Sequence, residues 1–319
     1  MADERKTALV LGATGGIGGA LARLLLARGW HVRALHRDPA RVAGGAPEYE
    51  WVTGDAMDRD VVLRAGRGMR VIVHAVNPPA YRNWPGLVLP MLDNSIAAAV
   101  REQARLVLPG TVYVYGPDAG AAVDETAPQA PRTRKGAIRM AMETRLRQAS
   151  GVGARALVVR AGDFFGPGVG NSWLAQGMVP GRGPVRRIFN PARPGIGHAW
   201  AYLPDLAETM ARLIERDEDL AGFADFQFGG TWVEDNRRFA EAIRDALGRP
   251  DLPIRRFPWP LVHALAPFNE TAREMREMIY LWRRPLRLLD GKLRALLGTL
   301  PETPLDIALR ATLAAQGRI

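Results

Sequence analysis

Short apolar runs alternate with longer stretches of helical periodicity over the first half of the chain. The apolar runs predict strands at 7–11, 31–36, 49–53, 71–75, 111–115 and 156–160. The periodic stretches predict helices at 17–28, 58–65, 92–106 and 133–149. Strands and helices that alternate in this way form right-handed βαβ units on a parallel sheet. We therefore predict an α/β fold with a doubly wound parallel sheet.

The pattern changes after about residue 165. Gly and Pro crowd residues 166–197, which predicts a long loop region that shapes a substrate pocket. Later elements are predicted as helices at 204–215, 233–247 and 259–284, and as a strand at 226–228. We expect two parts. Residues 1–165, with sheet contributions from later segments, form the first, and residues 166–319 form a smaller substrate-binding and helical part.

Composition narrows the function classes. The 319 residues are 47% hydrophobic and 24% charged, as in a globular chain, and the lack of cysteine excludes disulfides, thiolate metal sites and cysteine nucleophiles. The 43 Lys and Arg against 33 Asp and Glu make a net charge of +10. The basic residues are spread along the chain, which favours a solvated surface that attracts nucleotide phosphates over a nucleic-acid site.

Localisation and partners follow from what the chain lacks. We see no secretory signal and no stretch near the roughly 20 apolar residues of a membrane helix. We expect a cytoplasmic protein with a small-molecule substrate and with neither a nucleic-acid nor a membrane partner. Attachment to a membrane surface through the Arg and Trp residues of 280–285 stays open as an alternative. A homodimer is compatible with the sequence.

A glycine-rich turn joins the first predicted strand to the first helix. In such a turn the first glycine permits a tight bend, the second lets backbone N–H groups approach a pyrophosphate, and the third allows the helix to pack on the strand. The helix N-terminus adds donors for the phosphates. The turn predicts a Rossmann-type dinucleotide site made by Gly12, Thr14, Gly15, Gly16, Ile17 and Gly18.

The end of the second strand bears on the choice of dinucleotide. An acid about 20 residues beyond the glycines would accept the ribose hydroxyls of NAD, but the chain has His36 and Arg37 there. A guanidinium pairs with a 2′-phosphate, so NADP is favoured as the cofactor. Asp38 follows directly and keeps NAD open, as does a purely solvated role for Arg37.

These motifs resemble the short-chain dehydrogenase/reductase superfamily, and the chain is most similar to atypical members close to its extended NAD-dependent epimerase/dehydratase branch. The resemblance covers about residues 7–230. It rests on the glycine turn and on the ordered motifs at 54–55, 73–77, 114–117 and 160–167. It implies that Asp55, Ala75 and Asn77 line the adenine and ribose. It also implies an oxidoreductase or epimerase-like enzyme that acts on a carbonyl or an alcohol.

The resemblance further implies a catalytic Ser or Thr, a Tyr, and a Lys four residues later. Counting back from the Val-Tyr-Gly motif puts Thr111 in the hydroxyl position, but no Tyr-x-x-x-Lys occurs in the chain. Matching the family's helix glutamate to Glu143 puts Lys135 in the tyrosine position and Arg139 in the lysine position. Lys135 can transfer a proton if burial and the neighbouring guanidinium lower its pKa, while Arg139 holds the ribose.

A structural alternative competes with that assignment. Lys135, Arg139, Glu143 and Arg147 are spaced i, i+4, i+8 and i+12, which also fits a solvated salt-bridge stripe. An enzyme is then not required. The chain can equally be a dinucleotide-binding sensor or scaffold that kept the fold without the chemistry, or an NAD-dependent sugar-nucleotide epimerase or dehydratase.

Further candidates come from the later motifs. Asp163 occupies the place of the family's Asn beside the substrate and is the fourth catalytic candidate, with a hydrogen-bonded loop acid as the alternative. Tyr113 offers a substitute phenol, and with Asn171 and His198 it completes the candidate substrate contacts. His74 is flanked by apolar residues, which predicts a core histidine. No His, Asp or Glu cluster has the spacing of metal ligands, so no metal is expected.

Overall fold

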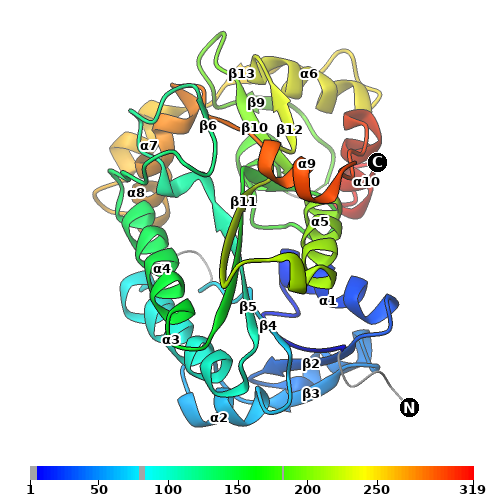
Figure 1. Ribbon diagram of the computed structural model, residues 1–319. Helices are drawn as coiled ribbons and strands as arrows, with labels where there is room; N and C mark the ends of the chain where they lie inside the picture. Colours follow the sequence, from blue (N-terminus) through cyan, green and yellow to red (C-terminus); the bar gives the residue numbers. More distant parts are fainter. Residues whose placement is uncertain (1–5, 79–82, 182) are drawn as a thin grey trace. The chain divides into compact units, whose positions relative to one another are not determined.

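The computed structural model describes residues 6–78, 83–181 and 183–319 and divides the chain into two compact units (Figure 1). The first unit comprises the described part of Met1–Gly110 together with Ile138–Arg160 and Ala207–Phe226. The second comprises Thr111–Ala137, Ala161–Leu206 and Gln227–Ile319.

A seven-stranded sheet forms the centre of the first unit. Its strands, in chain order, are β1 Thr7–Leu11, β2 His31–His36, β3 Glu50–Thr53, β4 Val71–His74, β5 Arg105–Thr111, β7 Arg155–Ala161 and β11 Phe223–Gln227. They lie in the order β11-β7-β5-β4-β1-β2-β3, with parallel pairing from β3 through β5. Because the strand order reverses between β1 and β4, their carboxyl ends open the crevice in which such sheets bind ligands. The predicted Rossmann-type fold is confirmed.

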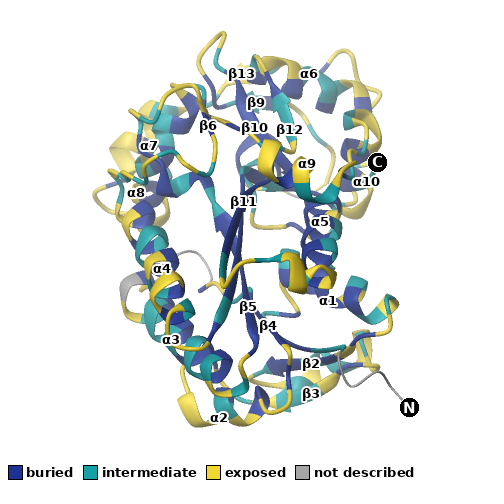
Figure 2. Ribbon diagram, in the orientation of Figure 1, coloured by how far each residue is buried: buried dark blue, intermediate teal, exposed yellow. Residues whose placement is uncertain are grey.

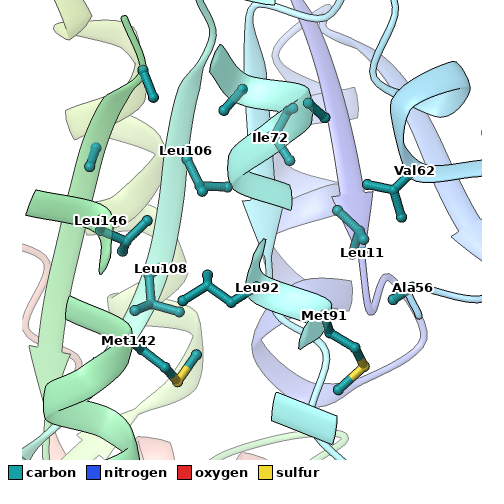
Figure 3. Packing of buried hydrophobic residues seen from close by; sticks show 14 of the residues in the cluster. Leu11, Ala56, Val62, Ile72, Met91, Leu92, Leu106, Leu108, Met142 and Leu146 are labelled. Carbon is teal, nitrogen blue, oxygen red and sulfur yellow. The ribbon is translucent and has the colours of Figure 1, made fainter. Parts of the chain in front are cut away.

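Helices cover both faces of this sheet. Their bounds are α1 Gly16–Ala27, α2 Arg59–Ala65, α3 Trp84–Glu102, α4 Arg134–Ser150 and α5 Leu203–Glu215. The core between the sheet and the helices α2, α3 and α4 packs Leu11, Ile72 and Leu106 against Val62, Leu92 and Leu146 (Figure 3). On the other face, α1 lies beside the later part of α5, and Arg28 after α1 donates to Glu208 at 2.6 Å.

The structure corrects two predicted elements. The helix expected to reach 106 ends at Glu102, and the strand expected at 111–115 runs instead over Arg105–Thr111. Gln103 adopts a left-handed φ of 51°, which ends the helix. Arg105 hides the strand in the sequence because an arginine is rarely buried, yet its guanidinium is fully buried and its Nε donates to Asp217 at 2.5 Å. A 3₁₀ turn, Val112–Val114, follows.

Small sheets and helices build the second unit. Its strands are β6 Ala122–Val123, β8 Asp163–Phe165, β9 Ile188–Asn190, β10 His198–Tyr202, β12 Thr231–Val233, β13 Ile254–Arg256 and β14 Arg287–Leu288. They form the sheets β12-β10-β8, β13-β9 and β14-β6. Its helices are α6 Asn236–Ala246, α7 Trp259–Leu265, α8 Glu270–Glu277, α9 Gly291–Leu297 and α10 Leu305–Ala315. The region 166–197 is more ordered than predicted, because it includes β9 and a π-helix at Trp173–Met178.

A separate core holds the second unit together. Phe165, Trp200 and Phe239 are fully buried in it, and the rings of Trp200 and Phe239 stack with their centroids 4.1 Å apart. Figure 2 shows this division of exposure, with β10 dark blue and much of α7 and α8 yellow. The aromatic residues of this region therefore pack the core, as one of the two sequence interpretations held.

Candidate active site and dinucleotide-binding turn

The glycine turn lies against the end of β4. Gly12 has a φ of +94°, and a Cβ atom there would stand 2.6 Å from the carbonyl oxygen of Ala75. A Cβ atom on Gly18 would stand 2.9 Å from the Ala75 Cβ. The Gly15 amide donates to the Gly12 carbonyl at 2.9 Å, which closes the turn. Both approaches are shorter than real Cβ contacts, so the close packing of turn and strand requires glycine at 12 and 18.

The first turn of α1 has the donors that a pyrophosphate needs. Gly15 occupies the N-cap and has no side chain with which to accept from the N–H groups of the next residues. Thr14 and Gly15 are exposed, and Gly16 and Ile17 are half-buried. An anion bound here would accept from these backbone groups and would meet the positive end of the helix dipole. The residues of the turn therefore fit a dinucleotide.

The other predicted cofactor residues follow the carboxyl ends of neighbouring strands. Arg37 comes directly after β2 and is exposed, and Asp55 lies two residues after β3. The Asp55 carboxylate accepts from the Met57 amide at 2.9 Å. Ala75 follows β4, and Asn77 lies exposed two residues later. Because parallel strands end at one edge of a sheet, these positions share the edge that bears the glycine turn.

A buried ion cluster joins α4 to the sheet. The Arg160 guanidinium donates to the Glu143 carboxylate, with Nη2 2.7 Å from Oε2, and to Asp225 Oδ2 at 2.8 Å. Arg160 and Glu143 are 1% and 3% exposed. The alternative of a solvated salt-bridge stripe is therefore wrong, because Glu143 pairs with the sheet and Lys135 is also buried. Only Arg147 lies exposed, with its guanidinium 3.9 Å from the centre of the Phe223 ring.

Arg139 lies one helical turn before Glu143 and is half-buried. Its guanidinium lies 4.9 Å from the centre of the Trp84 ring. His74, at the end of β4, is buried as predicted, with Nδ1 2.8 Å from the Ser95 hydroxyl. Burial, assisted by the nearby Arg139 charge, lowers the pKa of His74 to about 3. The ring is therefore neutral at physiological pH, which rules out a cationic role for His74.

Asp163 and His198 form a buried pair in the second unit. They begin the neighbouring strands β8 and β10, and Asp163 Oδ2 lies 2.8 Å from His198 Nε2. The Tyr113 hydroxyl donates to Asp163 Oδ1 at 3.4 Å. The His198 ring stacks on Trp282 at a centroid distance of 3.8 Å and an angle of 7°. Asp163 is thus a strand residue paired with histidine, and the expectation of a loop acid is wrong.

A small cavity adjoins this pair. It measures about 10 Å³, close to the room that one water molecule needs. Its lining residues are Val112, Asp163, His198, Ala199, Leu281 and Leu286. The Asp163 carboxylate and the His198 ring supply its polar wall, and the other side chains are apolar. A carbonyl oxygen or a water molecule is the size of group that this cavity admits.

Lys135, at the start of α4, is almost fully buried in the same unit. Its Nζ lies 3.1 Å from Glu274 Oε2 and donates to the Glu274 carbonyl oxygen at 3.2 Å. Burial lowers the pKa of Lys135, against the opposing charges of Glu274, Glu277 and Asp163. The expected lowering by the Arg139 guanidinium is wrong, because the charged groups that act on Lys135 are carboxylates. Sequence reasoning missed Glu274, which lies more than 100 residues away on a tail helix without a motif.

The remaining candidates are placed less closely. Thr111 is half-buried, and its Oγ1 accepts from the Tyr113 amide at 3.3 Å, so its hydroxyl proton can still be donated. Asn171 is exposed, and no described contact joins it to Asp163 or His198. Tyr280, which sequence reasoning missed, donates its hydroxyl to the Tyr115 carbonyl oxygen at 2.8 Å. Burial and the Asp163 charge raise the pKa of Tyr280.

A family model for the NAD dependent epimerase/dehydratase family matches residues 8–227. The chain belongs to this family. The model spans β1 to β11, including the glycine turn, Thr111, Lys135 and Asp163, so the resemblance drawn from the motifs is confirmed. A nicotinamide dinucleotide is the family's cofactor, and the turn described above fits it.

Two curated relatives are named as reductases. The family member is 34% identical over 178 residues to a 3-diazoavenalumate denitrifying reductase from a Streptomyces species, which covers 51% of this chain and 57% of the relative. It is 30% identical over 190 residues to a ceramide reductase from Caulobacter vibrioides, which covers 59% of this chain and 55% of the relative. The matches thus span little more than half the length of these relatives.

Solved structures share the fold over nearly the whole chain. The Bordetella bronchiseptica enzyme WbmH in complex with NAD+ matches with a TM-score of 0.72 and 20% identity, covering 97% of each chain. A UDP-glucose 4-epimerase from Bifidobacterium longum in complex with NAD+ and UDP matches with a TM-score of 0.73 and 16% identity, covering 98% of each chain. At these identities the likeness concerns the fold.

Two searches of the described residues complete the description of the site. Within residues 6–78, 83–181 and 183–319, no three His, Asp or Glu side chains are grouped so as to hold a metal ion. Across the same ranges, no helix has the length and apolar character needed to span a membrane.

Proposed function

We propose that this family member is an NADP-dependent oxidoreductase that acts on a carbonyl or alcohol group of a small molecule. The observation that carries the proposal is the buried cluster of Lys135, Asp163 and His198, which lies in the same unit as Thr111. Such a concentration of buried titratable groups is typical of active sites. The two relatives named as reductases favour this reaction class.

Each residue has a definite part in the proposed reaction. Thr111 donates its hydroxyl proton to the substrate oxygen and fixes its position. Lys135 supplies the proton that this oxygen gains on reduction, because burial lowers the pKa of its ammonium and so makes the proton easier to release. A nicotinamide dinucleotide, when bound at the glycine turn, supplies or accepts the hydride.

The Asp163 and His198 pair has a supporting part. The Asp163 carboxylate opposes the lowering of the Lys135 pKa by burial and so favours the charged, proton-bearing form. His198 and the Tyr113 hydroxyl hold that carboxylate in place from two sides. In the proposed reaction, the ion pair between Lys135 and Glu274 must loosen when substrate enters, because a doubly bonded ammonium is a poor proton donor.

Turnover of purified protein tests these roles. A panel of carbonyl compounds is followed by the loss of absorbance of NADPH at 340 nm, with wild type, Lys135→Met, Lys135→Arg and the control Lys292→Met, whose lysine is exposed. We expect both Lys135 variants to lose about 10²- to 10⁴-fold in kcat, since arginine keeps the charge but cannot release a proton. Lys292→Met should match wild type. Full activity of Lys135→Arg would refute the proton-transfer role.

The preference for NADP rests on Arg37. This exposed residue follows β2, where a 2′-phosphate would lie, whereas a carboxylate would favour the free hydroxyls of NAD. Calorimetric titration with NADPH and NADH should show tighter binding of NADPH to wild type. Arg37→Glu should reverse the preference, and Arg310→Glu, which makes the same change in net charge at another exposed site, should not. Equal affinity of wild type for both dinucleotides would refute the preference.

The same measurements separate the other functions that the sequence left open. A sensor or scaffold would bind the dinucleotide tightly and turn over no compound of the panel. A sugar-nucleotide epimerase would retain NAD through purification and would interconvert a nucleotide sugar without net loss of the reduced form.

A further inference from the structure

The segment from Phe257 to Glu277 exposes more apolar surface than its own small core buries. That core consists of Val262, Ala266 and Ala272, with Phe257 and Trp259 packed against it. On the outside lie Leu261, Leu265 and Phe268, with exposed fractions of 56%, 46% and 90%. Their spacing of four and then three residues places them on one face of α7 and of the turn that follows. Figure 2 shows this hairpin of α7 and α8 largely in yellow.

Four exposed arginines accompany these apolar side chains. Arg255 and Arg256 lie in β13, immediately before α7, and Arg273 and Arg276 lie on α8. Within the described ranges, none of the four guanidinium groups has a carboxylate within 4.0 Å, whereas most other arginine clusters of the chain are paired. We call the four arginines together with Leu261, Leu265 and Phe268 the α7–α8 surface.

We propose that the α7–α8 surface binds to the surface of an anionic lipid bilayer. Unpaired arginines attract phosphate headgroups, and a short helix with Leu and Phe on one face places these side chains at the boundary of the acyl chains. The charge of the surface therefore complements the charge of the membrane. This proposal is independent of the proposed function, and it departs from the sequence prediction that no membrane is a partner.

The exposure of Phe268 favours a bilayer over a protein partner. A ring that is 90% exposed projects into solvent on nearly all sides. A fluid acyl layer can surround such a ring, whereas a protein partner would need a pocket of matching shape. Because α7 has only seven residues, it can lie in the interface but cannot cross a bilayer. The attachment is therefore peripheral and reversible, and it should weaken as salt screens the arginines.

Flotation of the full chain with vesicles tests the proposal. Purified protein is mixed with vesicles of equal phosphatidylcholine and phosphatidylglycerol, or of phosphatidylcholine alone, at 0.05 and 0.5 M NaCl. We expect binding to the anionic vesicles at low salt, with at least tenfold weaker partitioning to neutral vesicles or at high salt. Phe268→Asp and Leu265→Asp should each reduce partitioning about tenfold. Val152→Asp, the same kind of change at a residue 70% exposed in the first unit, should not.

A fluorescent label reports whether the apolar tip enters the bilayer. The chain has no cysteine, so Phe268→Cys and Val152→Cys each provide one site for an environment-sensitive fluorophore. Anionic vesicles should raise and blue-shift the emission at position 268 and leave that at 152 unchanged. Both sites are exposed, so neither substitution removes a buried contact, and unchanged melting temperatures confirm folding.

Several results would overturn the proposal. Wild type that stays with the unbound fraction at low salt refutes it directly. Binding that Phe268→Asp and Leu265→Asp leave unchanged shows that other basic residues attract the vesicles. Sedimentation velocity is run in parallel, because a dimer that Phe268→Asp converts to a monomer would assign the α7–α8 surface to a second copy of the chain instead.

Discussion

The buried cluster of Arg160, Glu143 and Asp225 permits a quantitative prediction about how α4 is held. Arg160→Met keeps a long apolar side chain but leaves two buried carboxylates without their cation. Removing one partner from a buried ion pair typically costs about 3–5 kcal/mol, because the remaining charge is left uncompensated. For a domain of this size, 1 kcal/mol corresponds to roughly 2–4 °C in melting temperature. We therefore expect Arg160→Met to melt about 6–20 °C below wild type.

Arg155→Met is the matched control for that experiment. Arg155 lies on the same strand and also pairs with an aspartate, Asp217, but its side chain is one third exposed and Arg105 remains as a second partner of Asp217. Exposed pairs contribute about 0.2–1 kcal/mol, so the control should melt within about 4 °C of wild type. Differential scanning calorimetry at pH 7 measures both variants.

Replacing the whole cluster separates the charge effect from packing. Arg160→Met combined with Glu143→Leu and Asp225→Leu removes the charges together, which in other buried triads is neutral or stabilising. We expect this triple variant to recover most of the stability that Arg160→Met loses. If Arg160→Met and Arg155→Met melt at the same temperature, the cluster does not anchor α4, and the reasoning about its burial is refuted.

Three further predictions concern the glycine turn and two titrating groups. Gly18→Ala should weaken NADPH binding at least tenfold in calorimetry, because its Cβ would meet Ala75, whereas Gly44→Ala has open space and should bind as wild type does; equal binding would contradict the turn geometry. His74 has a folded pKa of about 3, so the unfolded chain binds an extra proton below about pH 6.5 and stability falls as the pH drops from 6.5 to 3. His74→Gln should make that fall shallower by up to one proton in urea midpoints measured against pH, and an unchanged slope would count against a neutral buried ring. Lysine-selective carbon-13 NMR of this three-lysine chain should show Lys135 titrating below the usual lysine range, and still lower in Glu274→Gln; a shift upward would contradict the pairing.

Local patterns predicted most of the first unit correctly. The strands at 7–11, 31–36 and 71–74 and the helix α1 follow from runs of apolar residues and from the glycines between them. A run of β-branched and aliphatic residues favours a buried strand wherever it lies, and a glycine with positive φ ends an element without help from distant residues. The strand β5 escaped prediction because a buried arginine opens it, and the partner that makes this burial tolerable, Asp217, lies far along the chain.

The candidate site shows the same boundary between local and distant information. The motifs placed Thr111, Lys135 and Asp163 by number, but they predicted neither the burial of Lys135 nor its partner. Periodicity along one helix cannot tell a solvated stripe from a face that packs on other elements, because both place charges at the same spacing. Only the docking of α8 brings Glu274 to 3.1 Å from Lys135.

By itself, then, the sequence determined the parallel sheet, the dinucleotide turn and the identity of the residues beside it, because these depend on neighbours within a few positions along the chain. The tertiary structure alone decided which charges are buried and with whom they pair. It joined Asp163 to His198 and Arg160 to Glu143, and it left the α7–α8 surface uncovered. Pairing energies of this kind depend on desolvation and distance, and both are set only when segments remote in sequence pack together.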